Sequence, residues 1–124
     1  MRFARWVFRM AGIVGLLMLL PMYFLEEQIG RDQPPPIAHP EFFYGFVGVA
    51  VAWQFAFLVI SLDPQRYRLL MLPAVIEKFS FSLAAVALFV GGRLALPMLA
   101  AGMLDGIWGV LFFISFWLCR RKSS

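Results

Sequence analysis

Four ionisable or amide side chains stand inside long apolar stretches of this 124-residue chain: Gln54, Glu77, Lys78 and Asp105. Carboxylates next to a lysine can hold a proton, a cation or the polar end of a small ligand. A lone Asp, Lys or Arg at the centre of a membrane helix costs about 2.5–3.5 kcal/mol on insertion scales, so such groups are usually turned inward or paired. We therefore take these four residues as a candidate ligand or proton site. The alternative is a structural role, in which interhelical hydrogen bonds set the register of the helices.

The neighbours Glu77 and Lys78 cannot both point in one direction, because consecutive helical residues lie about 100° apart. Two arrangements are open for Lys78. Its long stem can carry the ammonium group toward the nearer membrane surface. Alternatively, Lys78 turns inward and reaches Asp105 on another helix. Glu77 would then form a hydrogen bond with Gln54 or with a serine hydroxyl.

Other chemical signals in the sequence are weak. His39 and the scattered carboxylates lack metal-ligand spacing, so we expect no metal. The sequence has no Gly-rich phosphate loop, HExxH motif or nucleophile elbow, so no cofactor is expected and nothing supports an enzyme. The net charge is +4, but the bases gather at the ends of apolar runs. That pattern disfavours nucleic acid as a partner and favours membrane lipids with anionic headgroups.

The composition requires lipid as the solvent, since 62% of the residues are hydrophobic and only 15% are charged, against about 25% in soluble domains. Lipid offers backbone groups no partners, so each apolar run should be a helix, and the lack of alternation rules out a β-barrel. Short connections predict antiparallel neighbours. The expected fold is all-α, a single transmembrane domain built as a four-helix bundle. Its expected spans are about 6–25, 42–62, 69–90 and 94–118, with an outer loop at 26–41.

Small residues recur at intervals of three or four in two of these runs, and such spacing lets a second helix approach closely. One stripe comprises Gly102, Gly106 and Gly109, and the other includes Gly48 and Ala52. We expect both to pack inside the bundle, because four helices already need inner contact faces. Packing across a homodimer or against a partner membrane protein is the alternative.

The basic residues are distributed unevenly around the expected helices. By the positive-inside rule, the side with more Lys and Arg faces the cytoplasm. Both termini and the middle loop are therefore expected in the cytoplasm, on a multi-pass protein of the inner (plasma) membrane. The first run lacks a small-x-small cleavage site, so we expect it to stay as an anchor. The expected cytoplasmic bases are Arg2, Arg5, Arg9, Arg66, Arg68, Arg120, Arg121 and Lys122, and the opposite side holds Arg31 and Arg93.

The stretches HPEFFYGFVGVAVAWQ, DPQRYRLLMLPAVIEKFSF and LDGIWGVLFF resemble a family of small bacterial four-span inner-membrane proteins, loosely DoxX-like in size and layout. The resemblance implies the same four-span layout. DoxX-like proteins are in some cases associated with quinone-linked oxidoreductases, but this sequence has no residues that carry that chemistry. The leading hypothesis is a binding or accessory module whose polar pocket holds a small amphipathic ligand or a partner helix. The alternative is a proton-coupled small-molecule transporter with Glu77 or Asp105 as the proton carrier.

Overall fold

The computed structural model of this protein describes residues 2–32 and 34–119, and within those ranges the chain forms helices and turns without any strand. The expected cytoplasmic bases Arg120, Arg121 and Lys122 lie outside the described residues. Two of the helices are extended by short 3-10 turns, η1 and η2. In chain order the elements are α1 (Arg2–Leu19), η1 (Leu20–Phe24), α2 (Glu26–Asp32), α3 (Pro40–Leu62), η2 (Arg68–Leu70), α4 (Met71–Val90) and α5 (Leu96–Leu118).

Within the described ranges, four helical segments are long and apolar enough to cross a membrane, and each has 23 residues. At 1.5 Å of rise per residue, such a segment is about 34 Å long, which exceeds the roughly 30 Å of hydrocarbon in a bilayer. The expected all-α membrane bundle with antiparallel neighbours is confirmed. The four segments indicate a multi-pass integral membrane protein. They are Arg2–Phe24, Pro40–Leu62, Arg68–Val90 and Leu96–Leu118.

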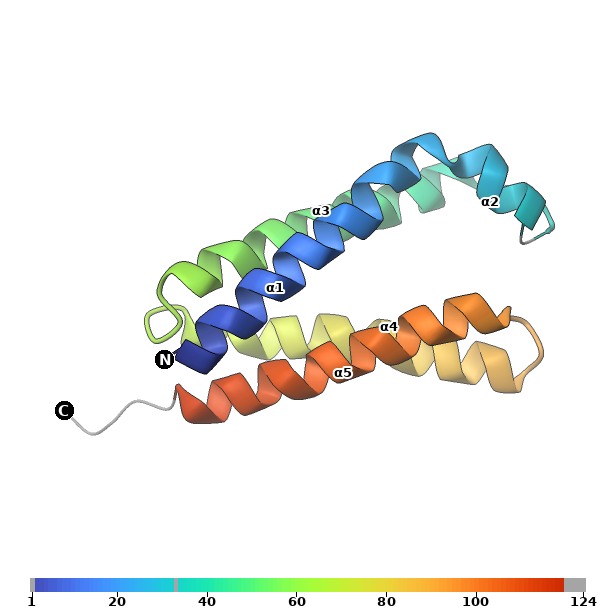
Figure 1. Ribbon diagram of the computed structural model, residues 1–124. Coiled ribbons are helices and arrows are strands. Elements are labelled where there is room, and N and C mark those ends of the chain that lie inside the picture. The colour runs from blue at the N-terminus through green and yellow to red at the C-terminus, as the bar shows by residue number, and fades with distance from the viewer. Residues whose placement is uncertain (1, 33, 120–124) are drawn as a thin grey trace.

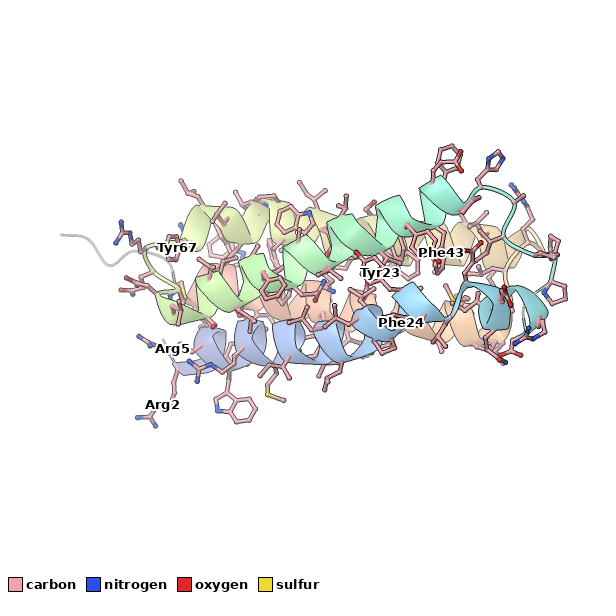
Figure 2. The ribbon with its side chains drawn as sticks, turned by 90° about the horizontal axis from the view of Figure 1, so that it is seen from above. Arg2, Arg5, Tyr23, Phe24, Phe43 and Tyr67 are labelled. Atoms are coloured by element: carbon pink, nitrogen blue, oxygen red, sulfur yellow. The ribbon has the colours of Figure 1, made fainter. Side chains whose placement is uncertain are left out.

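The four long helices form two hairpins, because α1 packs mainly against α3 and α4 packs mainly against α5. Figure 1 shows the hairpins close together at the end that holds the N-terminus and the α3–α4 turn, and farther apart at the end that holds α2. We call these the core end and the α2 end. Figure 2 shows Arg2 and Tyr67 at the core end, with Phe24 and Phe43 toward the α2 end.

Aromatic rings join the hairpins at the core end. Phe8 of α1 stacks on Phe112 of α5 with ring centroids 4.2 Å apart, and Phe57 of α3 meets Phe112 edge-on at 4.8 Å. Met71 and Ala74 of α4 belong to the same buried cluster. Aromatic pairs of this kind contribute about 0.5–1.5 kcal/mol beyond the area they bury. The core end is therefore filled by side chains from all four long helices.

The glycines of α5 face α4 at close range. A Cβ atom added at Gly106 would lie 2.8 Å from the Ser82 hydroxyl oxygen, and one added at Gly102 would collide with the Cβ atom of Ala85. Gly109 faces an aromatic ring of α4 in the same way. The stripe at 102, 106 and 109 thus lies along the contact between the two helices of the second hairpin.

The small residues of α3 lie differently. Gly48 faces the hydroxyl of Tyr23, which would be 3.4 Å from an added Cβ atom. Ala52 is exposed, so the expectation that it packs inside the bundle is corrected. Ala52 falls off the contact face because that face follows alternating steps of three and four residues. The buried residues of α3 are Val47, Ala50, Gln54, Phe57, Ile60 and Ser61.

The segment expected to be a loop at 26–41 instead contains the short helix α2. The Tyr44 hydroxyl donates a hydrogen bond of 2.9 Å to Oε1 of Glu26 and so ties α2 to α3. Glu27 and Arg31 form an ion pair at one helical turn of separation, a spacing that supports helix formation. The loop therefore folds back against the α2 end of the first hairpin.

Candidate ligand site

Lys78 turns inward and is buried between the hairpins, with 5% of its surface exposed. Its ammonium nitrogen donates a hydrogen bond of 3.4 Å to Oδ1 of Asp105 on α5. The same nitrogen lies 3.9 Å from Oε1 of Glu77, which is an ion-pair distance but too long for a hydrogen bond. Of the two arrangements left open by the sequence, the structure has the one in which α4 and α5 are joined through Lys78 and Asp105.

Gln54 of α3 points into the same region from the first hairpin and is 2% exposed. Its amide nitrogen donates a 2.8 Å hydrogen bond to the carbonyl of Ala50, one turn earlier on the same helix. A Cβ atom on Gly15 of α1 would overlap the Gln54 amide. The missing side chain at Gly15 therefore makes the space that the Gln54 amide occupies.

Two buried oxygen atoms, Gln54 Oε1 and Glu77 Oε1, accept no hydrogen bond from the residues that the structure describes. We call them the open acceptors. A buried polar atom without a partner costs about 1–3 kcal/mol in proteins. Most such atoms in native structures are explained by a bound water, ion or ligand, or by a functional role. Two open acceptors on facing hairpins can therefore receive hydrogen bonds from a bound donor.

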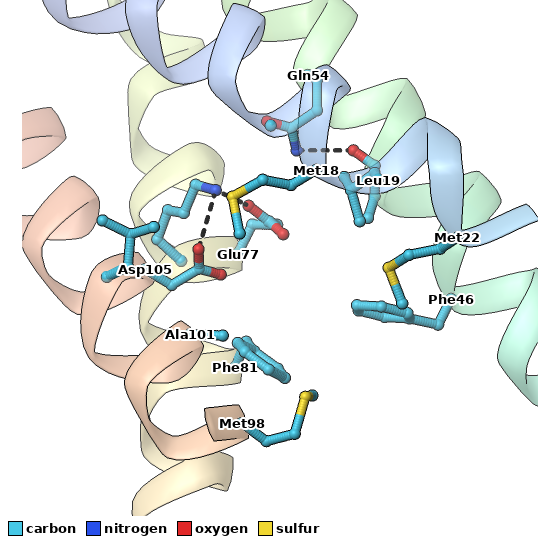
Figure 3. Close-up of a pocket in the computed structure, with 14 residues that line it drawn as sticks. Met18, Leu19, Met22, Phe46, Gln54, Glu77, Phe81, Met98, Ala101 and Asp105 are labelled. Carbon is cyan, nitrogen blue, oxygen red and sulfur yellow. Dashed lines mark hydrogen bonds and ion pairs between the residues drawn. The ribbon is translucent and has the colours of Figure 1, made fainter. Parts of the chain in front are cut away.

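A cavity of about 200 Å³ lies between the hairpins, and all four predicted site residues line it. Figure 3 shows Gln54 on one side and Glu77 and Asp105 on the other, with apolar side chains along the walls. The walls take residues from both hairpins, so the cavity exists only because the two hairpins pack at the core end and separate beyond it. Its apolar lining includes Met18, Leu19, Met22, Phe46, Phe81, Met98, Ala101 and Leu104.

The cavity has a polar end and an apolar end. On α4, Phe81 lies one turn closer to the α2 end than Glu77, and on α5 Met98 lies two turns closer than Asp105. On α3, Phe46 likewise comes about two turns before Gln54. The polar groups therefore sit at the inner end, next to the aromatic core. The apolar walls extend from there toward the α2 end.

The methionine and phenylalanine walls were missed at the sequence level. Met18, Met22 and Met98 lie in runs that are apolar on every side, so nothing in the sequence distinguishes a cavity wall from a lipid-facing side chain. Phe46 of α3 and Phe81 of α4 approach each other across the hairpins with ring centroids 6.1 Å apart. The signal was indirect: on α3, α4 and α5 the wall residues Phe46, Phe81 and Met98 lie at helical spacing from a polar site residue, whereas Met18 and Met22 of the first segment have no such neighbour.

The charged groups of the described cavity lining do not balance. Two carboxylates, Glu77 and Asp105, face one ammonium group, Lys78, which leaves one formal negative charge when all three are ionised. Elsewhere in the described ranges, no group of three or more His, Cys, Asp or Glu residues could hold a metal ion. His39 pairs with Glu41 at 3.7 Å; both side chains are exposed, and neither lines the cavity.

Comparisons with known proteins identify no relative of this chain. No protein family, curated protein or solved structure matches the chain. The cavity and its polar end are therefore the basis for the function proposed below.

Proposed function

We propose that this chain is a binding or accessory module of the inner membrane that holds a small amphipathic ligand in the cavity between its hairpins. The observation that carries the proposal is the pair of open acceptors at the inner end of a cavity with apolar walls. Ligand pockets typically combine a mostly apolar lining with a few convergent polar groups. Hydrogen bonding between the helices does not account for the open acceptors, because neither Gln54 Oε1 nor Glu77 Oε1 accepts a hydrogen bond from the described residues.

The size of the cavity supports a small ligand. An engineered apolar cavity of about 150 Å³ in a soluble protein is large enough to bind benzene, and the present cavity is about 200 Å³. A molecule with one ring or a short alkyl chain and one polar head fits these dimensions. Such a ligand would place its head between Gln54 and Glu77 and its apolar body along the methionines.

Photoaffinity labelling tests this proposal. The probe is a short-chain alcohol with a diazirine on its alkyl part, added to the protein in lipid nanodiscs, and the labelled peptides are mapped by mass spectrometry. We expect labels on the α1 and α5 segments that contain Met18 and Met98. Ala101→Trp fills the cavity and should remove these labels. Ala100→Trp is the matched control, because Ala100 is exposed on the same helix and its replacement leaves the cavity intact.

Labelling that spreads evenly over lipid-facing residues, and that Ala101→Trp does not lower, would contradict the proposal. Leu83 of α4 is a suitable reporter of such labelling, because 68% of its surface is exposed. A cavity ligand must distinguish the two tryptophan variants, whereas probe dissolved in the lipid does not.

A proton-coupled small-molecule transporter is the second candidate, favoured by the two carboxylates that share one ammonium group. In this case Glu77 or Asp105 would carry the proton. Substrate flux into proteoliposomes should then depend on a pH gradient and be lost in Glu77→Gln, with the amount of folded protein unchanged. Ligand binding without any such flux would favour the binding module.

We also propose that both termini face the cytoplasm. The support is that Arg2 and Arg5 lie at the core end together with the α3–α4 turn (Figure 2), in keeping with the positive-inside rule. Reporter fusions at Gln65 and Ser124 should signal from the cytoplasm and a fusion at Gln33 from outside. An outward signal at Ser124 would reject this orientation.

We also propose what surrounds the protein and how it assembles. Membrane lipids cover the many exposed apolar side chains of the helices. A homodimer or a partner membrane protein stays a proposal, as does the kinship with the small four-span, loosely DoxX-like proteins suggested by size and layout. Cross-linking in native membranes, with the masses of the products, tests the assembly.

A further inference from the structure

We infer that the ligand of this cavity is a small organic cation with N–H donors, a primary or secondary ammonium on an apolar body, bound head-first against Glu77 and Gln54. The inference rests on the proposed function and narrows it to one chemical class. It follows from three properties of the cavity: the kind of hydrogen-bonding atom that lacks a partner, the sign of the excess charge, and the shape of the walls.

The open acceptors are both oxygen atoms, and each can only accept while Glu77 is ionised. Gln54 already uses its amide nitrogen as a donor to Ala50, and Lys78 directs its hydrogen bond to Asp105. Neither group donates to Gln54 Oε1 or Glu77 Oε1, so both open acceptors lack a donor within hydrogen-bonding distance among the described residues. An ammonium group with two or three N–H bonds can supply both missing hydrogen bonds, whereas a hydroxyl supplies one and a carboxylate supplies none.

The formal charge of the polar end favours a cation. Glu77 and Asp105 share Lys78, whose nitrogen lies closer to Asp105 than to Glu77. A second positive charge next to Glu77 would balance the cluster, and hydrogen bonds between charged groups are about twice as strong as neutral ones. An anion in this position would meet two carboxylates with the only ammonium of the described lining already engaged. A buried charge without a partner is strongly disfavoured in the membrane interior.

The residues of the cavity walls indicate what the apolar body of the ligand is like and how it is oriented. Met18, Met22 and Met98 are flexible and polarisable, and they adapt to ligands of varied shape. Phe46 and Phe81 present aromatic rings from opposite hairpins. Met18 lies beside Glu77, whereas the other four wall residues lie on the α2 side of the polar groups (Figure 3). The apolar body of the ligand therefore points toward the α2 end and its head toward the core end.

Calorimetric titration of the unmodified chain with four matched probes tests the inference. The probes are phenethylamine, its N-trimethylated analogue, phenethyl alcohol and phenylpropionate, at neutral pH, in nanodiscs of zwitterionic lipid with the heat of empty nanodiscs subtracted. The trimethylated analogue keeps the positive charge but has no N–H donor. We expect phenethylamine to bind at least tenfold more tightly than each of the other three. Glu77→Gln should weaken its binding at least tenfold, and Ala100→Trp should leave it unchanged.

The outcomes separate the two proposals. Equal or tighter binding of phenethyl alcohol, abolished by Ala101→Trp, would overturn the cation inference and keep the ligand cavity. Equal binding of the trimethylated analogue would overturn the requirement for donors. No cavity-dependent binding of any probe would overturn both the inference and the proposed function. The comparison among probes uses the unmodified protein, so it stands even when Glu77→Gln fails to fold.

Discussion

Replacing Lys78 with methionine removes the only described cation of the cavity lining and keeps the length and apolar stem of the side chain. At an effective dielectric constant of about 20, unit charges 3.4 Å apart, the Lys78–Asp105 distance, attract each other by about 5 kcal/mol. At 3.9 Å, the Lys78–Glu77 distance, the attraction is about 4 kcal/mol. Desolvation cancels much of both values, so removing one partner of such a buried pair costs about 3–5 kcal/mol in total. We expect a loss in this range for Lys78→Met.

A double-mutant cycle apportions this loss between the two carboxylates. The hydrogen bond to a charged group adds about 1.5–3 kcal/mol, and only Asp105 is within hydrogen-bonding distance of Lys78. The coupling energy between Lys78→Met and Asp105→Asn should therefore be about 2–4 kcal/mol. The coupling energy between Lys78→Met and Glu77→Gln should be smaller, because Lys78 makes no hydrogen bond to Glu77.

The assay is equilibrium unfolding in mixed micelles with a rising fraction of denaturing detergent. The fluorescence of the four tryptophans reports the folded fraction. Independent sites are additive within about 0.3–0.5 kcal/mol. Additive losses for Lys78→Met and Asp105→Asn would therefore refute the ion pair. A larger coupling to Glu77 than to Asp105 would refute the geometry of the cluster.

Three further predictions concern single positions. Gln54→Leu removes an open acceptor, so it should raise the free energy of unfolding by about 1 kcal/mol while weakening phenethylamine binding; lower stability would contradict the idea that the amide is kept for a ligand. Gly102→Ala should lower the free energy of unfolding by about 1–3 kcal/mol through overpacking against Ala85, whereas Gly45→Ala, where an added Cβ atom meets nothing within 4 Å, should be neutral or stabilising by up to about 1 kcal/mol. Burial raises the pKa of the Cys119 thiol, so less thiolate is present at a given pH; alkylation of folded protein should be slower than that of denatured protein and should accelerate only at more alkaline pH than for an ordinary thiol.

The number and type of the long helices were predictable because lipid leaves a continuous apolar run few options. Backbone groups must be paired within the segment, so length and hydropathy alone indicate each helix. The polar helix α2 lies outside these apolar runs, so length and hydropathy do not indicate it. It contains the ion pair of Glu27 with Arg31 and is tied to α3 by the hydrogen bond from Tyr44 to Glu26. The second of these is a tertiary contact that local sequence does not reveal.

The polar residues of the site could be selected from the sequence, but their arrangement could not. Charge inside an apolar run is conspicuous, so Glu77, Lys78 and Asp105 were evident from their type alone. The direction of Lys78 depends on where Asp105 lies after α4 and α5 have packed through Gly102 and Gly106. A surface-directed and an inward lysine have the same sequence signature, and only the packed hairpin distinguishes them.

The sequence also does not show which small residues of α3 lie on its packed face and which lie on its outward face. The helix is apolar nearly all round, so Ala52 looked equivalent to Gly48 by spacing. The packed face of α3 is instead set by its contact with α1, where Gly12 and Gly15 admit Leu58 and Gln54 at close range. Which stripe is buried therefore depends on the partner helix as well as on the spacing within α3.

The burial of Lys78 can be measured directly through its chemical reactivity. Acylation of amines in intact lipid nanodiscs, read out by mass spectrometry, distinguishes the peptide with Lys78 from the peptide with Lys122, the other lysine of the chain. We predict that Lys78 is acylated at least a hundredfold more slowly in the folded protein than after denaturation, and that Asp105→Asn reduces this protection. Equal acylation of Lys78 before and after denaturation would place its ammonium at the membrane surface and contradict the buried cluster.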